Sequence, residues 1–119
     1  MKIEGEIAFD NLNSRKISIA DHILVGVKLF IENFTTNIDL SFAKSIEGNP
    51  NIIIQLKKVI EFDFHYDEDT YYIEDYKIFY NNESNEFYLS LDPDYMIIEK
   101  SQNDCGIIKA KGISVITTN

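Results

Sequence analysis

The feature of this sequence that most limits its fold is an alternation of apolar and polar residues in short segments, which polar turns separate. Successive side chains of a strand point to opposite faces, so a period of two is typical of a β-strand with one buried face. Residues 36–42 illustrate this, with Ile38, Leu40 and Phe42 between polar residues. The same criterion predicts strands over residues 2–9, 15–20, 22–34, 36–42, 51–66, 71–80, 86–91 and 106–116.

Short polar segments bound these strands. Gly48 and Pro50 make residues 45–51 the clearest break, because glycine permits a positive φ and proline removes a backbone donor. Lys57 and Lys58 interrupt a long apolar run, which predicts a bulge or bend there. Segments rich in asparagine, aspartate and serine predict further turns at residues 10–14, 67–70, 81–85 and 92–94.

The predicted fold class is mainly β. We expect residues 1–119 to form a single domain, built as an antiparallel sandwich, a curved sheet or a partly open barrel with at most one or two short helices. The spacing of apolar residues over 22–34 also fits a helix, although its β-branched residues favour a strand. An α+β fold with a helix near residues 21–34 is therefore the alternative. Residues 95–104 fit either a short helix or an irregular crossing.

The charge of the chain is concentrated in one region. Residues 61–95 contain all seven tyrosines and eleven of the twenty acidic residues. Extended to Asp104, the region has thirteen acidic residues against Lys77 and Lys100, a balance of −11 in a chain whose net charge is −9. A field of this sign attracts basic molecules and speeds their encounter, so the pattern indicates a basic partner.

The same charge disfavours two classes of partner. Binding to nucleic acid or to anionic lipid depends on clustered lysine and arginine, so we expect neither direct nucleic-acid binding nor membrane binding. No apolar run approaches the roughly 18 residues that a membrane span needs. Glu4 and Glu6 fall where the apolar core of a secretory signal would run, and Cys105 is the only cysteine. We therefore expect a cytoplasmic protein without an internal disulfide.

The sequence offers little catalytic chemistry. His65 shares its strand parity with three carboxylates, those of Asp63, Asp67 and Asp69. A metal site or an acid/base pair at His65 is therefore one hypothesis, but solvated strand positions account for the same pattern and we favour that interpretation. Cys105 follows Asp104, whose negative charge opposes formation of a thiolate. Motifs for nucleotides, metals and hydrolases are absent, so we expect no enzyme, no cofactor and no metal site.

Tyrosines in such an acidic setting are typical of a binding surface, because the ring is large and rigid and the hydroxyl can form a hydrogen bond. On a continuous strand 71–80 that pairs with 86–91, one sheet face would comprise Tyr72, Glu74, Tyr76, Glu86 and Tyr88. Such a face can meet lysine and arginine side chains with carboxylates and with ring faces. The residues that we expect to bind a partner are Asp67, Glu68, Asp69, Tyr71, Tyr72, Glu74, Asp75, Tyr76, Glu86 and Tyr88.

Three runs resemble a pattern of small acidic bacterial proteins: YIEDYKIF at residues 72–79, FYLSLDP at 87–93 and NDCGIIKAK at 103–111. The resemblance covers residues 60–112 and is to immunity proteins, the cytoplasmic antidotes of contact-dependent inhibition and other polymorphic toxin systems. It implies a non-catalytic inhibitor that binds one cognate toxin, frequently a basic nuclease, as a monomer in a one-to-one complex. These families share no catalytic motif, so the resemblance transfers no site residue.

Three other functions fit parts of the pattern. A nucleic-acid mimic that inhibits a DNA- or RNA-binding enzyme would carry the same charge toward a different partner. A small-ligand-binding β-barrel would need an apolar cavity, and a purely structural domain would need no partner. The coincidence of tyrosines and acidic residues in one region favours a binding surface, and the resemblance favours an immunity protein among the binding functions.

Overall fold

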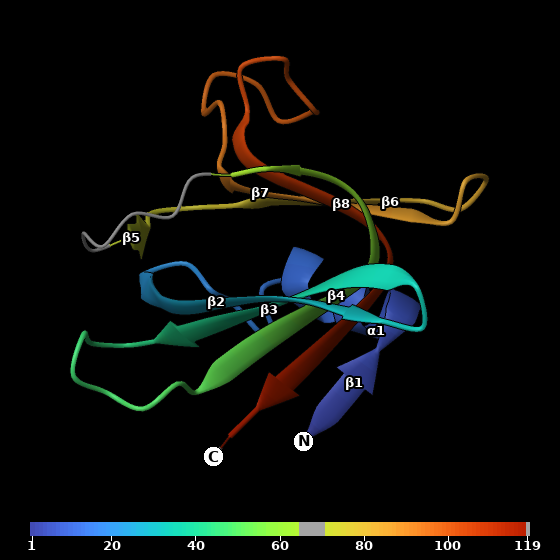
Figure 1. The fold of residues 1–119 in the computed structure, drawn as a ribbon. Coiled ribbons are helices and arrows are strands. Elements are labelled where there is room, and N and C mark those ends of the chain that lie inside the picture. The colour runs from blue at the N-terminus through green and yellow to red at the C-terminus, as the bar shows by residue number, and fades with distance from the viewer. Residues whose placement is uncertain (65–70, 119) are drawn as a thin grey trace.

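Eight strands and one helix make up the described part of the computed structural model, which covers residues 1–64 and 71–118. The elements are β1 (Lys2–Glu4), α1 (Gly5–Asn13), β2 (His22–Glu32), β3 (Thr35–Ala43), β4 (Ile52–Asp63), β5 (Tyr71–Ile73), β6 (Lys77–Asn81), β7 (Glu86–Asp92) and β8 (Cys105–Thr117). The strands form one antiparallel sheet in the order β5-β2-β3-β4-β8-β7-β6, and β1 pairs with β8 beside this path. The fold is mainly β, as predicted, with the sheet curled into a half-barrel (Figure 1).

The two edges of this sheet are neighbours in the sequence. β5 and β6 lie at opposite ends of the strand order, yet only residues 74–76 connect them. Such a connection reaches roughly 14 Å. Six spacings between strands of a flat sheet would separate the edges by roughly 29 Å. The sheet therefore has to curl until the end of β5 and the start of β6 lie close together, and we call this place the seam. Residues 71–77 of the acidic, tyrosine-rich segment lie at it.

β4 and β8 run through both halves of the curled sheet (Figure 1). β4 pairs with β3 over residues 52–56 and with β8 along its whole length, while β8 pairs with β7 near its start and with β1 near its end. Within β4, Lys58 has a φ of 54°, and the register with β8 shifts between Val59 and Glu61. The bulge predicted at the lysine pair is confirmed.

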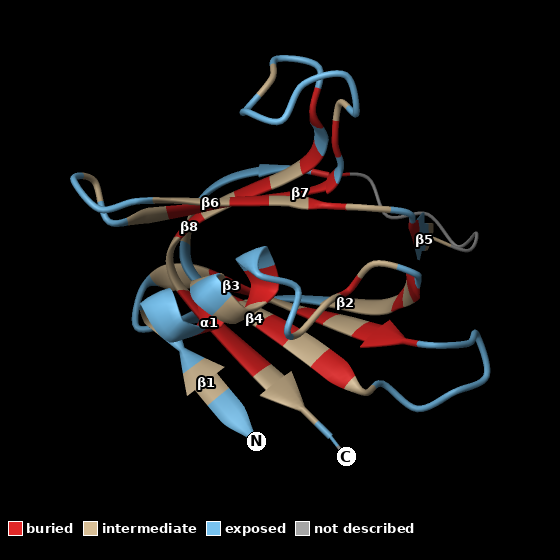
Figure 2. Cartoon of the chain, turned by 180° about the vertical axis from the view of Figure 1, so that it is seen from behind, coloured by how far each residue is buried: buried red, intermediate tan, exposed pale blue. Residues whose placement is uncertain are grey.

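The apolar core lies inside the half-barrel, where buried segments of the two sheet halves face each other (Figure 2). On β3, the alternating residues Ile38, Leu40 and Phe42 are all fully buried. β8 contributes Ile108, Ala110, Ile113 and Val115. Burial on alternate positions is the outcome that the period of two predicts, because a sheet with one covered face sends every second side chain inward.

The N-terminal segment is helical where the sequence predicted a strand over residues 2–9 and a turn over 10–14. Ile7, on which the alternating pattern depended, is 62% exposed, whereas Ala8 and Leu12, one helical turn apart, are fully buried. Gly5 has a φ of 64°, which suits glycine and turns the chain from β1 into α1. The helix packs against β6 and β8. The strand predicted over residues 15–20 is also wrong, since that segment is a loop.

The other strand predictions have clear outcomes. Residues 22–34 contain the strand β2, so the strand prediction is confirmed and the alternative helix is wrong. The strands predicted over 36–42, 86–91 and 106–116 are confirmed as β3, β7 and β8. The strand predicted over 71–80 is interrupted, because β5 pairs with β2 whereas β6 pairs with β7. The turn predicted at residues 67–70 lies outside the described residues.

Candidate functional site

The five residues predicted to share one sheet face do not do so. They are Tyr72, Glu74, Tyr76, Glu86 and Tyr88. β5 carries Tyr72 at one edge of the sheet, while Tyr88 lies on β7, next to the other edge. Tyr72 is 53% exposed, but Tyr76 and Tyr88 are 1% and 5% exposed. Glu86, at the start of β7, forms an ion pair of 3.7 Å with Lys111. The predicted site residues outside the described part of the chain are Asp67, Glu68 and Asp69, together with His65.

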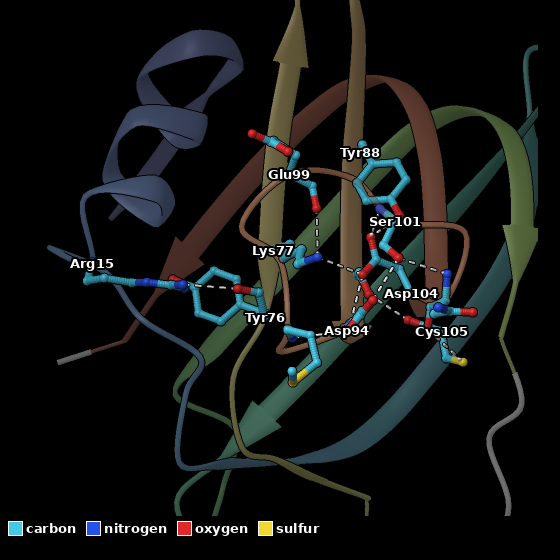
Figure 3. Close-up of polar contacts among 12 residues, drawn as sticks. Arg15, Tyr76, Lys77, Tyr88, Asp94, Glu99, Ser101, Asp104 and Cys105 are labelled. Carbon is cyan, nitrogen blue, oxygen red and sulfur yellow. Dashed lines mark hydrogen bonds and ion pairs between the residues drawn. The ribbon is translucent and has the colours of Figure 1, made fainter.

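Tyr76, the residue before β6, contacts the end of α1 and the segment that follows it. Its hydroxyl donates a hydrogen bond of 2.6 Å to the carbonyl of Leu12, near the end of α1. The guanidinium of Arg15 lies 3.7 Å from the centroid of the Tyr76 ring and donates to its carbonyl at 3.0 Å (Figure 3). The same guanidinium forms an ion pair of 3.1 Å with Asp75. Tyr76 and Asp75 thus fasten the start of β6 to the segment that follows the helix.

Asp104 is the centre of a buried network that holds the β7–β8 loop, residues 93–104, against β6 and β7 (Figure 3). Its carboxylate accepts four hydrogen bonds, from Lys77 Nζ at 2.9 Å, the Tyr88 hydroxyl at 2.7 Å, and the backbone amides of Asp94 and Ser101 at 2.8 Å and 2.9 Å. Lys77 also donates to the carbonyl of Glu99 at 2.7 Å. The Asp104 side chain is 0% exposed, so the loop is fixed to a buried charge.

The surroundings of Asp104 favour its charged form. Burial by itself raises the pKa of this carboxyl group, but the hydrogen bonds from Lys77, two backbone amides and Tyr88 outweigh burial and lower the pKa to about 2. For Tyr88, burial and then the hydrogen bond to Asp104 raise the pKa of the hydroxyl above its usual range. At neutral pH Asp104 is therefore a carboxylate. The Lys77 cation, two backbone amides and the Tyr88 hydroxyl stabilise its charge.

This pKa predicts a loss of stability in acid. The folded-state pKa of about 2 lies below the ordinary value of 3.8, so the Asp104 carboxylate stabilises the fold fully above about pH 4 and loses its contribution as the pH falls toward 2. The contribution at neutral pH is about 2 kcal/mol. The amide protons of Asp94 and Ser101, followed by NMR, should shift with a midpoint near pH 2. A midpoint near 3.8 would show that the network does not stabilise the carboxylate.

Three tyrosines line a hollow at the seam, which we call the tyrosine hollow. It has a volume of about 240 Å³. Part of its lining comes from β5 and the residue after it, and the rest from the end of β7 and the start of the β7–β8 loop. The lining residues are Tyr71, Tyr72, Glu74, Leu91, Asp92 and Tyr95. The hollow thus brings three predicted site residues together with Asp92 and Tyr95, which the sequence analysis did not include.

The tyrosine hollow is negatively charged. Burial, and after it the charge of Asp92, raise the pKa of Tyr71 to about 12. Burial, followed by the charges of Glu74 and Asp92, also raises the pKa of Tyr95. Both hydroxyls are therefore protonated at neutral pH, and the Tyr72 hydroxyl donates to the Asp21 carboxylate at 2.6 Å. The charge of the lining is accordingly that of two carboxylates.

An exposed apolar segment projects beside the tyrosine hollow. This loop tip consists of Tyr95, Met96, Ile97 and Ile98, of which Met96 is 88% and Ile98 is 89% exposed. Tyr95 lines the hollow and also a neighbouring groove of about 250 Å³, whose lining includes Arg15, Asp75, Tyr76, Ile97 and Ile98. Four consecutive exposed apolar residues on a loop fixed by buried hydrogen bonds form a patch of the kind that marks an interaction site.

Sequence reasoning missed the loop tip and Asp104 for different reasons. The apolar run at residues 95–98 carries a signal, because it does not alternate and stands between turn residues, but that signal identifies no ligand. Asp104 carries none, since it is one of thirteen acidic residues in the region. Its importance depends on the pairing of β7 with β8, which brings it to Tyr88 and Lys77.

Other features of the described residues bear on metal and membrane binding. Cys105 is exposed, and its Sγ lies 3.7 Å from the carbonyl of Asn103. In residues 1–64 and 71–118, no group of three or more histidine, cysteine, aspartate or glutamate side chains is placed to hold a metal ion. Within the same ranges, no helix has the length and apolar character needed to cross a membrane.

Comparison of the chain with protein-family models, with curated proteins and with solved structures found no match. The function has to be inferred from the tyrosine hollow, the loop tip and the Asp104 network.

Proposed function

We propose that this chain is a non-catalytic inhibitor that binds one basic partner protein in a one-to-one complex, and that it acts as an immunity protein toward a cognate toxin of the nuclease class. The observation that best supports this proposal is the position of the loop tip. A fixed, exposed apolar segment stands directly beside an acidic hollow lined with tyrosines. Apolar anchors next to polar and aromatic groups are the composition of protein-binding hot spots.

The attachment of the β7–β8 loop makes the loop tip suited to binding. A flexible segment loses conformational entropy when a partner orders it, and that loss weakens affinity. Here Asp104 bonds to the amides of Asp94 and Ser101, on either side of the tip, and Lys77 holds the carbonyl of Glu99. The tip is therefore ordered before a partner arrives, so burial of Met96 and Ile98 contributes to affinity with little ordering cost.

The charges around the loop tip indicate the sign of the partner. Residues 61–104 contain thirteen acidic residues and two lysines. One of these lysines, Lys77, is already paired with Asp104 in the buried network. The other, Lys100, lies 5.0 Å from the ring of Tyr88. Beside the loop tip, the tyrosine hollow carries the carboxylates of Glu74 and Asp92, so this surface would attract a basic protein over long range and bind it more weakly at high salt.

The test is calorimetric binding to the purified C-terminal domain of the protein encoded immediately upstream. We expect a dissociation constant on the order of nanomolar at low salt, and weaker binding at moderate salt. A double variant, Met96→Ser with Ile98→Ser, should weaken binding at least about tenfold, because it removes both exposed anchors. Its stability should be unchanged, since neither side chain is buried in the free protein.

Ile46→Ser is the matched control. Ile46 is an exposed apolar residue in the loop between β3 and β4, away from the β7–β8 loop (Figure 1). This variant should bind within about twofold of the parent chain. Absence of binding at micromolar concentrations would overturn the inhibitor proposal for this partner. Equal affinity of the double variant and the parent chain would show that the loop tip is not part of the interface.

A further inference from the structure

We propose that the tyrosine hollow is the receptor site for an arginine side chain of the partner protein. The proposal rests on the proposed function for the identity of the partner, but the chemistry of the hollow can be tested without it. The lining offers two carboxylates and the rings of Tyr71, Tyr72 and Tyr95 around a space of about 240 Å³. A guanidinium group is the protein side-chain cation that uses both kinds of lining group at once.

The same chemistry already operates next to the hollow, within the chain. The Arg15 guanidinium lies over the Tyr76 ring at 3.7 Å and forms an ion pair of 3.1 Å with Asp75 (Figure 3). Glu74, the residue before Asp75, lines the tyrosine hollow. The hollow therefore repeats the combination of a tyrosine ring and a carboxylate, with a carboxylate one residue earlier in the chain and no arginine in its lining.

The two carboxylates of the hollow differ from their neighbours in lacking a cation. Asp75 is paired with Arg15, and Asp104 is paired with Lys77. Among the residues that the structure describes, Glu74 and Asp92 accept no side-chain hydrogen bond and form no ion pair. Their charges nevertheless act on the hollow, because both raise the pKa of Tyr95. An incoming cation would gain two carboxylate contacts without breaking an existing ion pair.

Arginine fits this lining better than lysine does. The guanidinium group is planar and stacks on an aromatic face while its N–H groups bind a carboxylate in the same plane. Tyr72 and Tyr95 are 53% and 56% exposed, so their rings are open to such stacking. An ammonium group is a more strongly hydrated point charge that cannot stack on a ring, so it would gain less from the tyrosines.

The experiment is an NMR titration of the isotope-labelled chain with N-acetyl-arginine amide. We expect saturable shifts confined to the lining residues of the hollow, with a dissociation constant on the order of millimolar. N-acetyl-citrulline amide, which has the same shape without the charge, should give no saturable shift. N-acetyl-lysine amide should bind at least about threefold more weakly than the arginine probe, because its ammonium group is more strongly hydrated and lacks the planar stacking of a guanidinium group.

Two double variants distinguish a specific binding site in the tyrosine hollow from non-specific attraction to acidic residues. Glu74→Gln with Asp92→Asn should weaken arginine binding at least about fivefold. Glu83→Gln with Glu47→Gln removes the same charge from two loops outside the hollow and should leave binding within about twofold. Equal loss in both pairs, equal binding of citrulline, or shifts spread over all acidic residues would overturn the arginine site.

The two proposals fail separately. Saturable arginine binding together with no binding of the upstream domain would support the arginine site and overturn the inhibitor proposal for that domain. Tight binding of the domain by the parent chain, with no saturable response to the arginine probe, would support the inhibitor proposal and overturn the arginine site.

Discussion

Replacement of Asp104 by asparagine is expected to lower the free energy of unfolding by about 3 kcal/mol. The substitution keeps the size of the side chain but removes the charge that balances Lys77, whose Nζ lies 2.9 Å away in the buried network. An unbalanced buried cation costs more than the lost hydrogen bonds alone. Urea unfolding followed by circular dichroism measures the change, and the slope with urea concentration should stay constant if the folded state keeps its compactness.

Two further substitutions test whether charge balance is the cause. Lys77→Met should destabilise the chain by a similar amount, since it leaves the Asp104 carboxylate unpaired, and the double variant should lose less than the sum of the two. Glu61→Gln removes an exposed ion pair of 3.5 Å with Lys109 and should cost under about 1 kcal/mol. If Asp104→Asn costs no more than Glu61→Gln, the network does not hold the β7–β8 loop.

Replacement of Tyr76 by alanine is expected to lower the free energy of unfolding by about 4 kcal/mol. The ring is 1% exposed and packs in the apolar core beside the end of α1, so its removal leaves a cavity there. It also removes the surface on which the Arg15 guanidinium lies. Tyr76→Phe should cost only about 1 kcal/mol, the loss of the 2.6 Å hydrogen bond to the Leu12 carbonyl.

Tyr72→Ala provides the comparison, because Tyr72 comes from the same acidic segment but is 53% exposed. Its loss should cost under about 1 kcal/mol, mainly through the hydrogen bond to Asp21. Thermal unfolding of the three variants gives the order of stability. If Tyr76→Ala keeps the parental stability but weakens partner binding, Tyr76 belongs to the partner-binding surface, as the sequence analysis predicted.

Sequence patterning and burial agree best where one face of a strand is covered. β3 and the first half of β8 bury alternate side chains, so the local period matches the tertiary environment, whereas β7 is buried continuously from Phe87 to Leu91. The pattern failed at residues 2–9, where Ile3, Ile7 and Phe9 alternate although the segment pairs as a strand only to Glu4. The helix that follows buries Ala8 and Leu12, a spacing that the alternation obscured.

The sequence predicted which region of the chain contains the candidate site, but not which residues of that region belong to it. Composition located the acidic, tyrosine-rich segment, and residues 71–77 of that segment lie at the seam of the half-barrel. Parity placed Tyr72 and Tyr76 on one face, yet the former is exposed and the latter is buried, because residues 74–76 leave one edge strand and enter the other. Which strands are edges depends on pairings between distant parts of the chain, and single-residue patterns carry no information about them.

The place of β8 in the sheet also has a consequence for how the protein is made. β8, the last strand of the described residues, lies inside the sheet, with β4 along one side and β7 and β1 along the other. A ribosome releases the earlier strands first, and until these thirteen residues follow, β4 and β7 each present an unpaired edge. The sheet can be completed only after β8 has left the ribosome, because β8 joins β4 to β7 and β1. A nascent chain that stops before β8 lacks the strand to which β7 pairs, and with it the support of the loop that carries Tyr95.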